Sequence, residues 1–270
     1  MSGTDPAADP PVNVNVWGPP VLKARRPVGM GDVIVGLVLF FLLSSIPAVI
    51  AFMVLLPKFA AMSDPSAVVQ SVTEAGPVII SSLVLSWCGL LIPVWWAATR
   101  KGDGDWRALL KWQVNWRRDI PLALAFMVVL RSAEAIVGWL LELLGVDTSA
   151  LGNGAMLSTV SGGWLIAMLL GASIGAPIVE EIFFRGLFLS VAIRNWGRWF
   201  GVIVTSATFG LMHAQATVES SLYTVSSTAI IGLCLALLVL RTNRLGTSIL
   251  SHIAFNTSGV VLMLISGGLT

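Results

Sequence analysis

Three short polar groups in the second half of the chain interrupt apolar sequence with residue types that can do acid–base chemistry. In order, they are Glu180-Glu181-x-x-x-Arg185, Phe209-x-x-x-His213 and His252-x-x-x-Asn256. Glutamate and histidine are common general acids and bases. A carboxylate that faces hydrocarbon costs at least about 2.5 to 3.5 kcal/mol on insertion scales. An ionisable residue in such a segment therefore indicates a functional site.

The spacing within these groups places particular side chains on one face of a helix. Residues four apart lie on the same face, so Glu181 can form an ion pair with Arg185. Glu180 is rotated by about 100° from Glu181 and is left free to face elsewhere. His252 and Asn256 are also four apart and could jointly donate hydrogen bonds to one substrate atom.

The composition indicates an integral membrane protein. Of the 270 residues, 56% are hydrophobic and only 11% are charged, a balance that no soluble domain of this size would tolerate on its surface. The formal net charge of +2 comes from a few basic loop residues, and nothing indicates a nucleic-acid partner. Cys88 and Cys234 lie in apolar runs, which excludes the disulfide framework of a secreted domain.

Apolar runs of about 18 residues or more span a bilayer as helices, because each backbone amide must find its partner within the segment. The sequence predicts an all-α, polytopic bundle of transmembrane helices. The seven expected spans are Val33–Leu56, Pro77–Ala98, Ile120–Leu144, Trp164–Ile193, Trp199–His213, Ser221–Leu240 and Gly246–Ser266. The fourth is longer than a bilayer needs and contains Pro177, so a break there would make an eighth segment.

The chain divides into a tail and one membrane domain. Residues 1–31 are rich in proline and end in a basic cluster, which predicts a disordered cytoplasmic tail. Residues 32–270 form the transmembrane domain, with the three polar groups in 164–270. Basic residues concentrate in alternate connections, so the positive-inside rule places the N-terminus in the cytoplasm and the C-terminus outside.

The three groups are expected at similar depths in the bilayer. Glu180 precedes Arg194 by about as many residues as His213 follows Arg198. At about 1.5 Å per residue, both side chains lie roughly 20 Å along their helices from the same surface. The same count from the basic residues before the last span brings the third group to a comparable depth. A single cavity could therefore contain all of them.

Two further pairs bear on this site. Arg131 and Glu134 lie in the middle of the third span, three residues apart, where an ion pair lowers the cost of both charges. A contact between Arg131 and a substrate carboxylate is the alternative. Gly171 and Gly175 form a face of small residues that lets a neighbouring helix approach closely just before the glutamate pair.

The three groups carry a resemblance to the CAAX protease and bacteriocin-processing family, the intramembrane glutamic endopeptidases related to the type II CAAX prenyl endopeptidase. The family pattern E-E-x-x-x-R falls on Glu180, Glu181 and Arg185. F-x-x-x-H falls on Phe209 and His213, and H-x-x-x-N/D on His252 and Asn256. No departure is seen in these residues. The resemblance covers the chain from about Trp164 onward.

The resemblance implies a role for each residue in peptide hydrolysis. Glu180 would be the general base that takes a proton from the attacking water. His213 would hold and polarise that water, and His252 and Asn256 would stabilise the oxyanion. Glu181 and Arg185 would orient Glu180. The implied substrate is a membrane-associated peptide or protein, without a cofactor, and the implied location is the bacterial plasma membrane.

Three other interpretations stay open at this point. Two histidines and a glutamate can bind zinc, although no H-E-x-x-H helix is present. A non-catalytic relative could act as a membrane scaffold or bacteriocin-immunity protein. A transporter is suggested by intramembrane glutamate and histidine, but the sequence shows no inverted repeat. Cleavage of a substrate would distinguish the endopeptidase from the other two functions.

Overall fold

The computed structural model describes residues 28–59, 75–101, 110–148, 162–215 and 217–265, and every regular element in these ranges is helical. The predicted all-α, polytopic bundle is therefore confirmed. Six helical runs are long and apolar enough to cross a membrane: Met30–Leu55, Gly76–Thr99, Trp116–Leu143, Gly163–Trp196, Val218–Thr242 and Leu245–Ile265. The predicted disordered tail lies almost wholly outside the described residues.

The fifth expected span is a shorter helix than predicted. Helix α10 (Arg198–Leu211) has 14 residues, about 21 Å, whereas the hydrocarbon core of a bilayer is about 30 Å thick. His213 follows the end of α10 in a turn, where its backbone N–H donates to the carbonyl of Gly210.

The fourth expected span is one unbroken helical run, so there is no eighth segment in the described chain. The run consists of α7 (Gly163–Leu170), η2 (Gly171–Gly175), α8 (Ala176–Glu181), η3 (Ile182–Phe188) and α9 (Leu189–Trp196). Both η2 and η3 are π-helical, a wider turn that is frequent at functional sites. Pro177 is the second residue of α8 and does not interrupt the helix.

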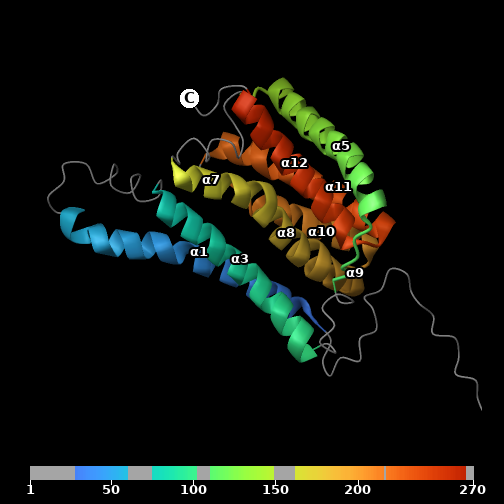
Figure 1. Cartoon of the computed structure of the whole chain (residues 1–270), viewed down its shortest axis with the longest axis horizontal. Coiled ribbons are helices and arrows are strands. Elements are labelled where there is room, and N and C mark those ends of the chain that lie inside the picture. Colours follow the sequence, from blue (N-terminus) through green and yellow to red (C-terminus); the bar gives the residue numbers. More distant parts are fainter. Residues whose placement is uncertain (1–27, 60–74, 102–109, 149–161, 216, 266–270) are drawn as a thin grey trace, which may run out of the picture.

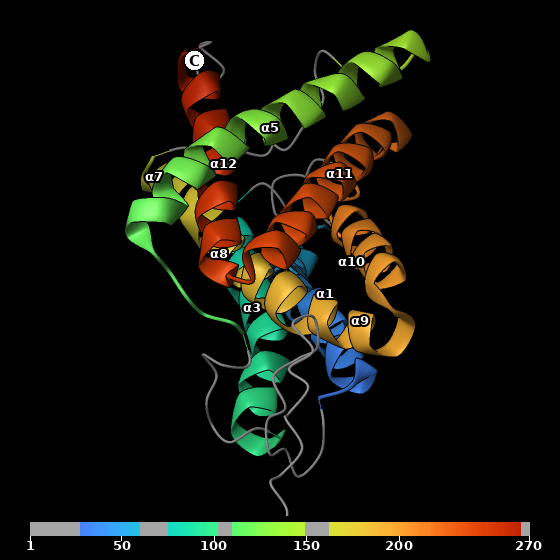
Figure 2. The same ribbon diagram turned by 90° about the vertical axis from the view of Figure 1, so that its right-hand side faces the viewer.

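The run α7–α9 lies in the middle of the bundle (Figure 1). On one side of it, α1 (Met30–Phe59) and α3 (Gly76–Trp96) pack against each other, and α3 also contacts α7 and α8. On the other side, α12 (Leu245–Ile265) contacts η2 and α8. Figure 2 shows α5 (Trp116–Leu143) crossing α12 and running alongside α11 (Val218–Thr242), with α10 beside α11.

Glycines allow the close helix approaches. A Cβ atom at Gly89 of α3 would lie 2.5 Å from the backbone nitrogen of Phe40 in α1. The predicted close approach before the glutamate pair is also observed, because a Cβ at Gly175 would lie 2.3 Å from the Trp87 ring. Between membrane helices, close packing stands in for the hydrophobic effect as the source of stability.

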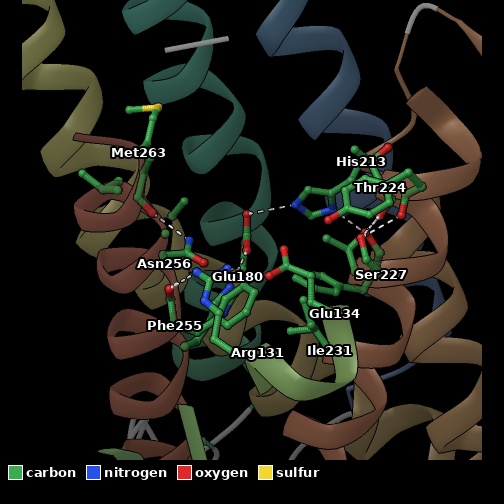
Figure 3. Close-up of a pocket in the computed structure, with 18 of the residues that line it drawn as sticks. Arg131, Glu134, Glu180, His213, Thr224, Ser227, Ile231, Phe255, Asn256 and Met263 are labelled. Carbon is green, nitrogen blue, oxygen red and sulfur yellow. Dashed lines mark hydrogen bonds and ion pairs between the residues drawn. The ribbon is translucent and has the colours of Figure 1, made fainter. Parts of the chain in front are cut away.

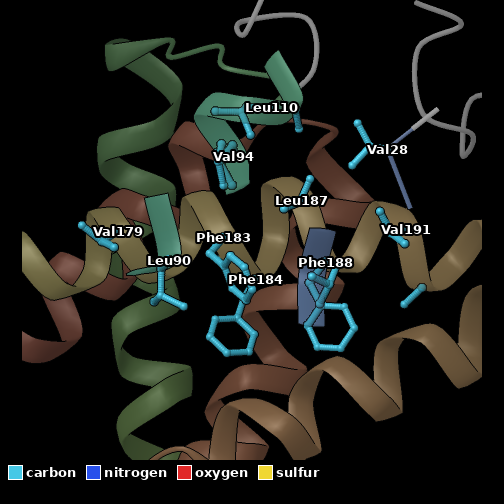
Figure 4. Close-up of a cluster of buried hydrophobic side chains, with 14 of the residues drawn as sticks. Val28, Leu90, Val94, Leu110, Val179, Phe183, Phe184, Leu187, Phe188 and Val191 are labelled. Atoms are coloured by element: carbon cyan, nitrogen blue, oxygen red, sulfur yellow. The ribbon is translucent and has the colours of Figure 1, made fainter. Parts of the chain in front are cut away.

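A buried aromatic cluster holds α8, η3 and α9 against the rest of the bundle (Figure 4). The ring centroids of Phe183 and Phe184 lie 5.2 Å apart, and those of Phe184 and Phe209 lie 5.0 Å apart. Val28, Leu90 and the side chains around them complete the cluster. Because Phe183 and Phe184 lie two and three residues after Glu181, this packing sets the rotation of the helix that carries both acids.

An ion pair joins the starts of α5 and α12. The buried carboxylate of Asp119 lies 2.5 Å from the Arg244 guanidinium and accepts hydrogen bonds from Thr247 and from the backbone of Asn115. A buried charge is tolerated only when it is paired and hydrogen-bonded in this way. These contacts fix the register of α12 against α5.

Candidate active site

A cavity of about 420 Å³ opens between α5, the α7–α9 run, α11 and α12. Figure 3 shows the side chain of Glu180 near its centre, with His213 and Asn256 on opposite sides. His252 and Arg131 also line the cavity. The sequence suggested that one cavity could contain four side chains from three distant segments. The structure places all four in this cavity: Glu180, His213, His252 and Asn256.

Glu180 faces both imidazoles. Its Oε1 lies 3.9 Å from Nε2 of His213, and its Oε2 lies 3.9 Å from Nε2 of His252. These distances exceed that of a direct hydrogen bond and suit a bridge through one water molecule. The Glu180 side chain is 18% exposed, so its carboxylate can be reached from the cavity.

Glu181 is fully buried and holds three partners. Its Oε1 lies 3.1 Å from Arg185 and 3.2 Å from Nδ1 of His252, and its Oε2 accepts a hydrogen bond of 2.5 Å from Ser248. The expected ion pair with Arg185 is thus present. The carboxylate of Glu181 is turned toward α12 and contacts His252, and a role of Glu181 and Arg185 in orienting Glu180 stays a prediction.

The hydrogen bonds at Nδ1 define how both imidazoles are presented to Glu180. Nδ1 of His213 lies 2.8 Å from the backbone carbonyl of Phe209, which can only accept, so this nitrogen carries a proton. Nδ1 of His252 donates to the ionised Glu181 by the same reasoning. In both rings Nε2 is therefore the atom that remains for chemistry, and in both it points toward Glu180.

The ring of Phe209 packs against both imidazoles and against the guanidinium of Arg185. Its ring centroid lies 4.9 Å from the imidazole of His213 and 6.0 Å from that of His252, both edge to face. The guanidinium of Arg185 lies 4.4 Å from the same ring, a cation–π contact. The sequence did not indicate this role, because a phenylalanine in apolar sequence is ordinarily a packing residue.

Asn256 lines the cavity but is anchored away from Glu180. Its Nδ2 donates a hydrogen bond of 2.8 Å to the backbone carbonyl of Ala172 in η2. An amide nitrogen carries two protons, so one donor and the Oδ1 acceptor of Asn256 remain available. Asn256 and His252 lie one turn apart on α12 and both face the cavity, as their spacing predicts.

Arg131 and Glu134 form the ion pair expected in the middle of the third span, at 2.5 Å. Arg131 also donates to Ser258 at 2.9 Å and to the backbone carbonyl of Phe255 at 2.5 Å, and it stacks 3.8 Å above the Phe255 ring. Arg131 therefore ties α5 to α12, directly beside Asn256. Both members of the pair line the cavity.

Several residues in or around the site were not found from the sequence. Ser248 lies four residues before His252 on α12, a spacing that could have marked it as a member of the same face. One wall of the cavity consists of hydroxyl-bearing residues of α11, namely Tyr223, Thr224, Ser227 and Thr228. Thr224 and Ser227 donate to backbone carbonyls of their own helix, which leaves their oxygen atoms as acceptors.

The zinc alternative has no preformed ligand cluster in the part of the chain that the structure describes. No group of three or more histidine, cysteine, aspartate or glutamate side chains there is arranged to hold a metal ion. Cys88 and Cys234 are both free thiols.

The fold and the cavity indicate a multi-pass helical membrane protein with polar residues gathered inside the bundle. Comparison with known proteins narrows this class, because the family model for the type II CAAX prenyl endopeptidase Rce1-like proteins matches residues 162–258. This segment is therefore similar to that family, which confirms the resemblance seen in the three motifs. All six candidate residues fall inside the matched segment.

Two curated proteins are similar to part of the chain. The chain is 32% identical over 97 residues to the "Putative membrane peptidase YdiL" of Bacillus subtilis (strain 168), covering 36% of this chain and 37% of the relative. It is 31% identical over 99 residues to the "Uncharacterized 24.3 kDa protein" of Escherichia coli, covering 36% of this chain and 44% of the relative. The matches thus span less than half the length of either relative. No solved structure matches the chain.

Proposed function

We propose that this protein is an intramembrane endopeptidase in which Glu180 activates a water molecule for attack on a peptide bond. The observation that carries the proposal is the position of the Glu180 carboxylate, whose two oxygens each face an imidazole Nε2 at 3.9 Å inside a cavity. The similarity of residues 162–258 to the type II CAAX prenyl endopeptidase family supports it.

Each residue receives a role in this mechanism. Glu180 takes a proton from water, and the resulting hydroxide attacks the carbonyl carbon of the substrate. His213 holds that water through Nε2. As the peptide C–N bond breaks, the proton passes from Glu180 to the leaving amine, which balances the reaction.

The oxyanion requires donors on the side of α12. The free N–H of Asn256 is one such donor. His252 is the other candidate, and it faces the site with Nε2 because Glu181 occupies Nδ1. Donation from Nε2 requires a proton on both ring nitrogens. Loss of one oxyanion donor typically costs about a hundred- to a thousandfold in rate. Glu181, held by Arg185 and Ser248, is a positioning residue for His252 rather than for Glu180.

The substrate in this proposal is a peptide or protein that reaches the cavity from the membrane or its cytoplasmic side. The alternation of basic connections along the sequence supports a cytoplasmic N-terminus, and we propose the bacterial plasma membrane as the location. The C-terminus lies on the opposite side only if α10 and the turn after it cross the bilayer together. The CAAX endopeptidase family suggests a lipidated C-terminal segment as one substrate, and peptide precursors as another.

The variant Glu180→Gln tests the proposal. Wild type, Glu180→Gln and the control Glu142→Gln, whose carboxylate lies on the exposed surface of α5, are expressed at equal levels. New peptide termini in the membrane fraction are then quantified by mass spectrometry. We expect the rate at which these termini appear to be about 10²- to 10⁴-fold lower for Glu180→Gln, whereas the rate for Glu142→Gln equals that of wild type. Identical termini for wild type and Glu180→Gln would favour the non-catalytic scaffold instead.

A second measurement addresses the metal alternative. We propose that hydrolysis proceeds with protein groups alone, so cleavage by purified protein should survive treatment with EDTA and 1,10-phenanthroline. Elemental analysis of the same preparation accompanies the assay. Loss of cleavage on chelation, with recovery on adding zinc, would assign Glu180 and the two histidines as metal ligands.

A further inference from the structure

The hydrogen bond from Asn256 to the backbone carbonyl of Ala172 requires that this carbonyl be available in the middle of a helical run. A helical carbonyl ordinarily accepts from the N–H group four residues later. For Ala172 that residue is Ala176, yet its N–H group donates to the carbonyl of Gly171 five residues earlier. The π-helical turn therefore takes away the ordinary partner of Ala172.

The next backbone position cannot replace that partner. In a π-helical pattern, the donor for Ala172 would be the residue five positions later, which is Pro177. Proline has no N–H group. The shift at η2 and the proline together leave the Ala172 carbonyl without its α-helical and its π-helical donor, a costly state at membrane depth. The Nδ2 group of Asn256, from a helix 84 residues away in sequence, supplies the hydrogen bond at 2.8 Å.

We propose that Pro177 is a positioning residue for Asn256, and that it acts through the carbonyl group of Ala172. The Ala172 carbonyl, which has no backbone donor, accepts a hydrogen bond from one of the two amide protons of Asn256. This bond defines the rotation of the amide and directs its second N–H group into the cavity. For the catalytic consequence of this orientation, the inference rests on the proposed function. The hydrogen bond itself does not depend on that function.

The variant Pro177→Ala tests the proposal, because alanine restores an N–H group at position 177 that competes for the carbonyl of Ala172. Pro93→Ala is the matched control, since Pro93 is also a buried proline inside a helix but lies in α3. The protein is labelled with ¹⁵N-asparagine, and the side-chain amide signals of its seven asparagines are recorded in detergent micelles. The signal that disappears in Asn256→Ala identifies Asn256.

We expect the Asn256 amide signal to shift in Pro177→Ala and to stay in place in Pro93→Ala, with the other six signals unchanged. An unshifted Asn256 signal in a folded Pro177→Ala protein would overturn the proposal. Because this readout needs no substrate, its result is independent of whether the wild-type protein cleaves peptides, so failure of the two proposals can be told apart.

A stability measurement adds a second test. Asn256→Ala should lower the midpoint of thermal unfolding in the wild-type background, because Ala172 then loses its donor. The same change should lower the midpoint by less than half as much in the Pro177→Ala background, where the new N–H group serves as donor. Equal losses in the two backgrounds would contradict the proposal.

A third comparison applies if Pro177→Ala does not fold. Asn256→Ala and Asn256→Asp both remove the amide donor. Asn195→Ala removes a similar, partly buried hydrogen bond of 2.9 Å from the exposed residue Asn195 of α9 to the carbonyl of Val191. The two changes at Asn256 should lower the midpoint more than the change at Asn195. The same midpoint for all three variants would refute the anchoring of Asn256 by Ala172.

Discussion

Oε1 of Glu181 lies 3.2 Å from Nδ1 of His252, so the second glutamate of the pair holds the imidazole whose other nitrogen faces the first. Two adjacent glutamates thus face the two ring nitrogens of the same histidine. The arrangement depends on the difference of about 100° between neighbouring positions of a helix, which directs Glu180 into the cavity and Glu181 into the protein.

Removing the charge of Glu181 should destabilise the fold. Glu181→Gln leaves the buried guanidinium of Arg185 without its counter-ion, and breaking a buried ion pair in this way costs about 3 to 5 kcal/mol. The free energy of unfolding in mixed micelles measures the effect, with Glu142→Gln as the exposed control. The double variant Glu181→Gln/Arg185→Met should recover much of the loss. A change below about 1 kcal/mol for Glu181→Gln would show that the pair does not hold the fold.

Phe209 should be the most sensitive residue of α10. Phe209→Ala removes the ring beneath both imidazoles and Arg185, and such a deletion typically costs about 3 to 5 kcal/mol. Phe200→Ala, on the exposed side of the same helix, is the matched control and should change the free energy of unfolding by no more than about 0.5 kcal/mol. Comparable losses for the two variants would contradict the packing described here.

The role of Arg131 can be separated into structure and substrate binding. Arg131→Ala removes the contacts to Glu134, Ser258 and Phe255, and hydrogen bonds to charged groups contribute about 1.5 to 3 kcal/mol each. We expect a clear loss of stability in thermal unfolding, whereas the exposed Arg241→Ala should unfold as wild type does. If Arg131→Ala unfolds normally but cleaves with a raised KM, Arg131 contacts substrate instead.

The crossing of α1 and α3 should not tolerate a methyl group. The added Cβ of Gly89→Ala would lie 2.5 to 2.7 Å from backbone atoms of Leu39 and Phe40, which cannot move aside as a side chain would. Overpacking of this kind costs about 1 to 3 kcal/mol. The control is Gly163→Ala, where no atom lies within 4 Å of the added Cβ. Equal unfolding midpoints for the two variants would rule out a tight crossing.

Much of the fold follows from the sequence because hydrocarbon imposes strong constraints. Spans of apolar residues must be helical, and their number was predicted with one error, in which α10 was taken for a full span. The error arose because an apolar stretch of 15 residues does not reveal where its helix ends. The turn after Leu211 is stable because hydrogen bonds between Ser221 and the backbone of Gln215 satisfy it, and these are not visible in a hydropathy pattern.

The sequence alone identified polar side chains that share the cavity, because residue type and helix period are local properties of the chain. Only the tertiary structure decided which atoms meet. Helix spacing did not indicate that Glu181 turns toward His252, that Phe209 lies beneath both rings, or that Asn256 reaches the Ala172 carbonyl. These contacts depend on the rotation of each helix about its axis, which packing across the bundle and the two π-helical turns determine.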